Sequence, residues 1–191
     1  MKKNLIIGVI GLGYVGTPLA LSLGRFFKVV GYDLNKKRIL ELKNKKDSTN
    51  ETNLIEFIKA KKTFFTNKLK DLKDCNVFII TVPSPVTKTN KPDFYYLKKA
   101  SSLVAKVMNR KSIIIYESTV YPGATEEQCV PVLEKISKLK YNKDFFCGYS
   151  PERINPGDKK HKLENISKIV SASNTKTLDI LKFIYVVLFN K

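Results

Sequence analysis

The sequence has no tryptophan and little cysteine or histidine. Its 191 residues include three cysteines and one histidine. Three cysteines far apart along a chain are typical of reduced thiols rather than of a disulfide framework. The single histidine, His161, stands among lysines and has no second histidine at the spacing of a zinc site. We therefore expect no metal site and a reducing compartment.

Long apolar runs are also missing. No segment approaches the roughly 20 apolar residues that a membrane-spanning helix requires. The apolar run from Leu5 to Ile10 follows two lysines, as in a secretory signal, but the glycines that come next argue against such a signal. We expect a cytoplasmic protein with no membrane partner.

Acidic residues are scarce, with 17 Asp and Glu against 35 Lys and Arg and a formal net charge of +18. Such a charge attracts nucleic acid, an acidic membrane surface or a phosphorylated substrate. The lysines are spread through nearly every segment, and no nucleic-acid recognition motif accompanies them. We interpret the charge as a compositional bias and expect no nucleic-acid partner. Nucleic-acid binding through the charge would instead show a steep salt dependence.

Short apolar runs alternate along the chain with longer segments of helical period. This alternation is typical of βαβ units, so we expect an α/β fold: a Rossmann-type, doubly wound, mostly parallel sheet with helices on both faces. The expected strands are 5–10, 28–32, 64–66, 77–81, 112–116, 145–149 and 168–171. Two helical stripes are expected to face the core, one formed by Leu97, Ala100, Val104, Val107 and Met108, the other by Cys129, Val132, Leu133 and Ile136.

A GxGxxG motif follows the first expected strand. Gly11 permits a tight turn, Gly13 lets a pyrophosphate approach the backbone, and Gly16 allows close packing of helix on strand. Asp33 ends the second strand, where a carboxylate accepts hydrogen bonds from the ribose of NAD and repels the 2′-phosphate of NADP. The basic residues at 36–38 would partly offset that repulsion, but we expect NAD. The alternative is that the glycines only shape a turn and Asp33 only caps the next helix.

Three further motifs follow in order: TVPSP at 81–85, ESTVYPGAT at 117–125 and SPERINPG at 150–157. With the glycine motif, they resemble the UDP-glucose/GDP-mannose dehydrogenase family over residues 4 to about 180. The last two look most like the branch that acts on UDP-N-acetylhexosamines, whose acidic products enter bacterial surface polysaccharides. The UDP-glucose branch usually carries a second glutamate where Pro156 stands, so UDP-glucose is the less expected substrate. The choice among hexosamines stays open.

The resemblance implies a reaction. Family members oxidise the sugar C6 alcohol to a carboxylate with two NAD, through a covalent intermediate on a cysteine of the C-terminal domain. That cysteine motif, and the lysine and asparagine that support it, match nothing in this chain. Cys75, Cys129 and Cys147 each look like a small buried hydrophobe. We expect the catalytic nucleophile to be absent from the chain.

The resemblance also implies the site residues. By motif, the residues that contact NAD would be Gly11, Gly13, Tyr14, Val15, Gly16, Asp33, Arg38, Ser84 and Thr119. Glu152, Arg153 and Ile154 would face the nucleotide sugar. Thr119 and Glu152 are the candidates for the reaction step, in which Glu152 would position or deprotonate a hydrolytic water while Arg153 pairs with diphosphate or product carboxylate.

Each of these assignments has a purely structural alternative. Glu152 and Arg153 would then form an ion pair within a loop. Ser118 and Thr119 would cap the helix that follows them, and Tyr121 would simply be buried.

The domain organisation follows from the same comparison. We expect residues 1–175 to form the NAD-binding domain and residues 176–191 to begin a connecting helix, with the substrate domain that bears the cysteine absent. Ile180, Ile184, Val187 and Leu188 would form an apolar face of that helix in need of a partner. Such a chain would bind NAD and a UDP-sugar but be inactive alone, pairing with the other half of a split dehydrogenase or with itself. The alternative is a non-catalytic NAD-binding module.

Overall fold

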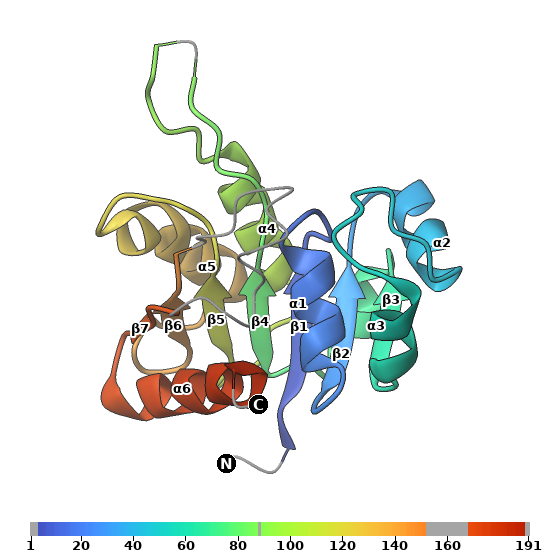
Figure 1. Cartoon of the computed structure of the whole chain (residues 1–191). Helices are drawn as coiled ribbons and strands as arrows, with labels where there is room; N and C mark the ends of the chain where they lie inside the picture. Colours follow the sequence, from blue (N-terminus) through green and yellow to red (C-terminus); the bar gives the residue numbers. More distant parts are fainter. Residues whose placement is uncertain (1–3, 88, 152–167, 190–191) are drawn as a thin grey trace.

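A computed structural model describes residues 4–87, 89–151 and 168–189 (Figure 1). The chain builds a seven-stranded sheet in the order β3-β2-β1-β4-β5-β6-β7. All neighbouring strands run parallel except β6 and β7, which are antiparallel. The strands are β1 Ile6–Ile10, β2 Lys28–Tyr32, β3 Thr63–Thr66, β4 Val77–Ile80, β5 Ile113–Tyr116, β6 Phe146–Tyr149 and β7 Ser171–Ala172. The expected Rossmann-type sheet is confirmed.

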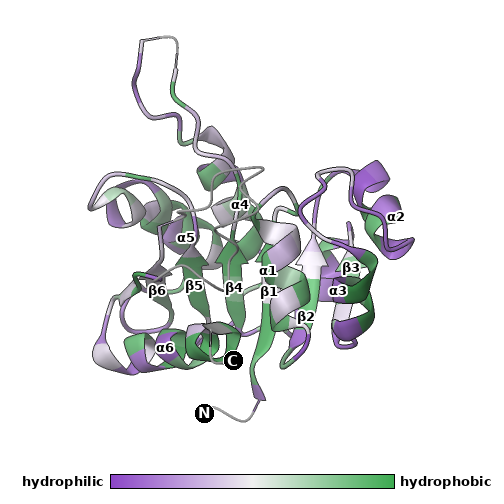
Figure 2. Ribbon diagram, in the orientation of Figure 1, coloured by the Kyte–Doolittle hydropathy of each residue, from purple (hydrophilic) through white to green (hydrophobic). Residues whose placement is uncertain are grey.

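Helices cover both faces of this sheet because its strands are apolar at nearly every position. They are α1 Gly16–Leu23, α2 Lys36–Lys43, α3 Leu54–Lys59, α4 Tyr95–Ala105, α5 Val130–Ser137 and α6 Thr175–Phe189. In β4, Val77 and Ile79 pack with α1, α3 and α6, while Phe78 and Ile80 pack with α4 and α5. Figure 2 shows largely apolar strands among helices, of which α2 is mostly hydrophilic and α6 is largely apolar.

The last expected strand is displaced. Residues 168–170 run outside the ladder, and only Ser171 and Ala172 pair with β6. The reason lies in competing contacts: the Ile169 carbonyl accepts a hydrogen bond from Ser150 Oγ (2.9 Å), and the Lys168 side chain forms an ion pair. The other six strands begin and end within one residue of the expected positions.

The five residues of the first stripe are all buried, as expected, but α4 ends at Ala105, so Val107 and Met108 follow the helix rather than belong to it. The second stripe is wrong at Ile136, which is 36% exposed, and Val132 is only half-buried. Ile136 lies in the last turn of α5, just before the chain leaves the helix through Lys138 in the left-handed conformation (φ 61°). A side chain so close to the helix end no longer faces the partner helix.

The expectation that α6 leaves an apolar face uncovered is also wrong. Ile180, Ile184 and Leu188 are buried in the same core as α1, and Val187 is half-buried. Gly148 in β6 allows this approach, since a Cβ there would lie only 2.5 Å from a methyl carbon of Leu181. The helix is thus a covering layer of the sheet.

Candidate functional site

The glycine motif forms the turn between β1 and α1, and two of its glycines are sterically required. Gly11 has a φ of +95°, and its N–H donates to the Tyr32 carbonyl (2.9 Å). At Gly16, a Cβ would lie 1.8 Å from the Gly11 carbonyl oxygen and 2.5 Å from Thr81 Oγ1. The two glycines therefore fix the turn and the contact between helix and strand, as the sequence predicted.

Gly13 differs because a Cβ there would meet nothing within 4 Å. The space beside it opens onto the amino end of α1, where, among the described residues, no side chain caps the helix. Unpaired amides at a helix start favour an anion, and a backbone without a side chain lets a diphosphate come close. The turn thus fits the diphosphate of a dinucleotide.

Asp33 lies immediately after β2, beside this turn. Its Oδ2 accepts from the Leu12 N–H (2.8 Å) and its Oδ1 from the Asn35 N–H (2.8 Å). The helix that follows, α2, is capped by Asn35, so the alternative in which Asp33 is the cap is wrong. Because a carboxylate has about four acceptor positions, the carboxylate keeps capacity for the hydroxyls of a ribose.

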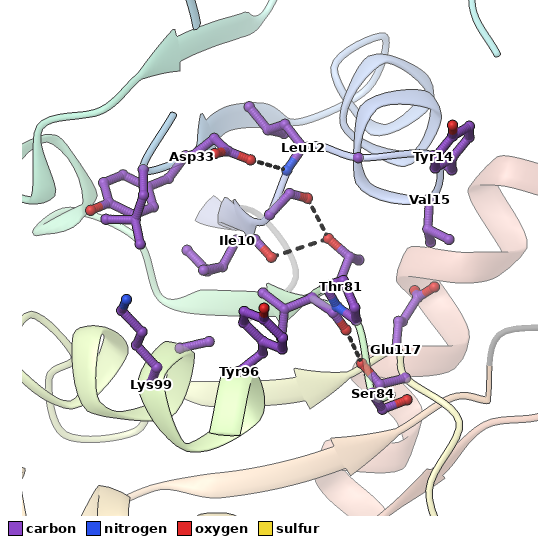
Figure 3. A pocket seen from close by; sticks show the side chains of 18 of the residues that line it. Ile10, Leu12, Tyr14, Val15, Asp33, Thr81, Ser84, Tyr96, Lys99 and Glu117 are labelled. Carbon is purple, nitrogen blue, oxygen red and sulfur yellow. Dashed lines mark hydrogen bonds between the residues drawn. The ribbon is translucent and has the colours of Figure 1, made fainter. Parts of the chain in front are cut away.

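A cavity of about 510 Å³ extends over the carboxyl ends of β2, β1, β4 and β5, within the size range of cofactor sites. Figure 3 shows Asp33 at one side of this cavity and Glu117 at the other. The expected residues that line it are Gly11, Gly13, Tyr14, Val15, Asp33, Ser84 and Thr119. Ligands of doubly wound sheets bind at this position, where the strand order reverses.

Hydroxyl groups join the loops that form the cavity floor. Thr81 Oγ1 bonds with the Gly11 carbonyl (2.6 Å), and Ser84 Oγ donates to the Thr119 carbonyl (2.8 Å). Ser118 Oγ donates to the Val82 carbonyl (2.8 Å). Ser118 and Thr119 therefore connect to the β4 loop, and no side chain in the described structure caps the turn at 125–129. The capping alternative is wrong.

Arg38 stands behind the glycine turn, outside the cavity lining. Its Nε donates to the Leu12 carbonyl (2.8 Å), and its Nη2 donates to Thr17 Oγ1 (2.8 Å) and pairs with Asp47 (2.7 Å). Burial alone would raise the pKa of Asp47, but hydrogen bonds from Thr49, Thr52 and Arg38 hold it below its ordinary value. Arg38 therefore stabilises the glycine turn through its hydrogen bonds to Leu12 and Thr17.

Glu117, at the other side of the cavity, is buried. Its Oε2 pairs with Lys168 Nζ (2.8 Å), and its Oε1 accepts from the Tyr185 hydroxyl of α6. The Glu117 side chain is fully buried and that of Lys168 is 6% exposed. These three residues join β5, the segment before β7, and α6 at the cavity wall.

The cavity residues to which the sequence assigned no role include the polar side chains Thr81, Tyr96, Lys99 and Glu117. Thr81 and Glu117 are the first residues of the motifs at 81–85 and 117–125, and their position directly after a strand could have indicated that they line the site. Tyr96 and Lys99 lie on α4 beside core-facing residues, and nothing in their spacing distinguishes them from solvent-exposed positions.

Some expected residues cannot be placed. Glu152, Arg153, Ile154 and His161 lie outside the described residues. Tyr121 is 38% exposed, so the alternative in which it is buried is wrong; its hydroxyl donates to Glu127 Oε2 (2.7 Å).

All three cysteines are free and buried, as expected. Burial raises the pKa of each thiol, to about 12 for Cys75 and well above the ordinary value for Cys147, while hydrogen bonds to Ser101 and Tyr116 partly offset the rise at Cys129. Because the thiolate is the nucleophile, burial and a raised pKa disfavour a nucleophilic role for these thiols.

Comparison with known proteins accounts for this cavity. Residues 5–189 match the model of the UDP-glucose/GDP-mannose dehydrogenase family, NAD binding domain. The chain belongs to this family. NAD is accordingly its cofactor, as the glycine motif and Asp33 predicted. Among relatives, UDP-N-acetyl-D-glucosamine 6-dehydrogenase of Pseudomonas aeruginosa is 52% identical over 96% of this chain and 43% of its own length. Protein CapL of Staphylococcus aureus is 53% identical over 97% of the chain and 43% of its own length.

Solved structures of the family share the fold. UDP-D-ManNAc dehydrogenase from Pyrococcus horikoshii superposes with a TM-score of 0.85 and 32% identity over 97% of this chain and 45% of its own. GDP-mannose dehydrogenase from P. aeruginosa gives 0.87 at 24% identity, over 97% and 44%. This dehydrogenase-family chain thus spans less than half the length of the relatives it matches. None of its described helices is long and apolar enough to cross a membrane.

Proposed function

We propose that the chain is the NAD-binding half of a nucleotide-sugar 6-dehydrogenase that oxidises the C6 alcohol of a UDP-N-acetylhexosamine to a carboxylate. The observation that carries the proposal is the cavity between Asp33 and Thr119 with the open space at Gly13. Two relatives that are 52% and 53% identical over the aligned region support the substrate class, since one of them is named for UDP-N-acetyl-D-glucosamine. The free cysteines favour the cytoplasm.

In this proposal the residues of the chain bind and orient. The Asp33 carboxylate accepts hydrogen bonds from the adenosine ribose hydroxyls, and the backbone amides of the turn at 11–16 bind the diphosphate. Held by these residues, NAD would supply the hydride acceptor for oxidation of the sugar carbon. Thr119, an exposed residue tied to Ser84 through its carbonyl, lies at the reacting end. Glu152, Arg153 and Ile154 contact the nucleotide sugar, and Glu152 positions the hydrolytic water.

The nucleophilic thiolate comes from outside these 191 residues. Cys75, Cys129 and Cys147 are buried with raised pKa values and do not line the NAD cavity. A polypeptide or segment that supplies a reactive cysteine is therefore the partner that the chemistry requires.

Calorimetric titration with NAD, followed by an assay for NADH formation with UDP-N-acetylglucosamine, tests this function. The unmodified chain should bind NAD, Asp33→Ala should weaken binding at least about tenfold, which is 1.4 kcal/mol, and neither should form NADH. Asp74→Ala is the matched control, because Asp74 is an exposed carboxylate before β4, outside the cavity lining. Its affinity should equal that of the unmodified chain.

Three results would overturn parts of the proposal. Absence of NAD binding by the folded chain would refute the cofactor site. NADH formation that depends on the sugar would refute the claim that the nucleophile lies elsewhere. NAD binding that persists unchanged in Asp33→Ala would place the adenosine outside this cavity.

A further inference from the structure

A buried carboxylate at the cavity wall joins three parts of the chain that are far apart in sequence. Glu117 follows β5, Lys168 lies three positions before the first residue of β7, and Tyr185 belongs to α6. The Lys168 ammonium also lies 5.7 Å from the centroid of the Tyr185 ring. One carboxylate is therefore held from two sides, by a cation and by a hydroxyl.

Burying this ion pair removes both charges from water, and apolar side chains could fill the same space without that loss. A buried ion pair is often no more stabilising than apolar side chains of similar volume, because both charges lose their hydration. Where such a pair is retained, its contribution is a fixed geometry rather than stability. What the pair fixes here is the start of the loop at 117–119, which lines the cavity and carries Thr119.

The sheet order places that loop over one half of the bound dinucleotide. Asp33 follows β2 and Glu117 follows β5, on opposite sides of the reversal between β1 and β4. With the adenosine at Asp33 and the diphosphate at the glycine turn, the nicotinamide half extends over β4 and β5. Glu117 thus stands behind the nicotinamide end.

The same pair also reaches the segment assigned to the sugar. Ser150 lies just before that segment, which was assigned as residues 152–154, and Lys168 and Ile169 lie 14 and 15 positions after it. Ser150 Oγ donates to the Ile169 carbonyl (2.9 Å), which brings the two flanks together, and Lys168 attaches one flank to Glu117. The contacts therefore set the flanks of residues 151–167 relative to the cofactor cavity.

We propose that Glu117, held by Lys168 and Tyr185, is a positioning residue for the nicotinamide half of bound NAD. This inference rests on the proposed function, because it requires NAD in the cavity. Glu117 acts through the backbone of residues 117–119, which it holds against the cavity. The adenosine diphosphate half contacts the other side of the cavity and does not depend on it.

The test compares the affinities of NAD and ADP by calorimetry in Glu117→Gln and Tyr185→Phe. ADP contains the adenosine and diphosphate of NAD but no nicotinamide. Both variants should weaken NAD binding at least about fivefold and change ADP binding less than about twofold, where tenfold corresponds to 1.4 kcal/mol. Asp33→Ala is the opposite control and should weaken both ligands. A lower population of folded protein would reduce the apparent affinities for NAD and ADP by the same factor. The ratio of the NAD affinity to the ADP affinity therefore separates positioning from destabilisation.

Tyr185→Phe keeps the test decisive if Glu117→Gln, which removes the charge that pairs with Lys168, unfolds the chain, since Tyr185→Phe removes one hydroxyl and no charge. An unchanged ratio of NAD to ADP affinity in folded Tyr185→Phe would overturn the inference while leaving the proposed function intact. Failure of the unmodified chain to bind either ligand would overturn the proposed function itself.

Discussion

At the scale of single residues, the three glycines of the GxGxxG motif have different roles. Gly11 supplies a backbone conformation, Gly16 leaves room for a carbonyl, and Gly13 leaves room for something that the protein itself does not provide. The first two positions therefore affect folding, and the third affects binding. A pair of alanine substitutions separates these roles.

Gly13→Ala should keep the stability of the chain and lose NAD affinity by about tenfold or more, because its methyl group enters the space assigned to the diphosphate. Gly16→Ala should lower the free energy of unfolding by about 3 kcal/mol, because the methyl group would overlap the Gly11 carbonyl oxygen. Urea unfolding and calorimetry measure the two effects. Equal stability of both variants would contradict the assignment.

Asp47 gives a prediction about pH. Its folded-state pKa is lowered, so its contribution to stability is present above its unfolded pKa, near 3.9, and is lost as the pH falls through the folded value. Asp47→Asn removes one of the two carboxylates that pair with the buried Arg38, the other being Glu41 (3.0 Å), and should reduce the free energy of unfolding at pH 7 by about 2 kcal/mol. The difference from the unmodified chain should shrink below pH 4. A difference that stays constant down to pH 3 would show that charge is not the cause.

At the scale of elements, α6 decides how much of the sheet is covered. Its residues Ile180, Leu181 and Ile184 are almost fully buried, and Leu181 fills the space that Gly148 leaves open. The same helix supplies Tyr185 to the carboxylate at the cavity wall. The element therefore serves both the core and the site.

Leu181→Ala should lower the free energy of unfolding by about 3 kcal/mol, through lost burial and the cavity that remains. Val186→Ala is the matched control: its side chain lies on the same helix but is 49% exposed, and its effect should stay within about 0.5 kcal/mol. Chemical denaturation of both variants gives the comparison. If the two changes cost the same, α6 is not packed as described.

At the scale of the whole molecule, the sequence predicts the sheet well because its signals are local. Short apolar runs mark most of the strands, and the glycine motif marks the turn after β1. The pairing of Lys168 and Glu117 was not predictable, because those residues are 51 positions apart and only the fold joins them. Tyr96 and Lys99 were missed for a similar reason: their position on α4 gains meaning only where the helix faces the cavity. Both misses concern the site, where contacts between distant segments matter most.

The covered face of α6 shows the same limit in the core. Its apolar spacing predicted a face that needs a partner, but not that the sheet of the same chain covers that face. The answer depends on Gly148, one residue of a strand more than 30 positions away, whose missing side chain lets the helix approach.

The central claim is that NAD lies in the cavity between Asp33 and Glu117, and a crystal structure of the chain grown with NAD tests it most directly. In that structure we expect the adenosine ribose of NAD beside Asp33, its diphosphate at Gly13, and its nicotinamide near residues 117–119. A dinucleotide bound in the reverse direction, or at another surface of the chain, would contradict it.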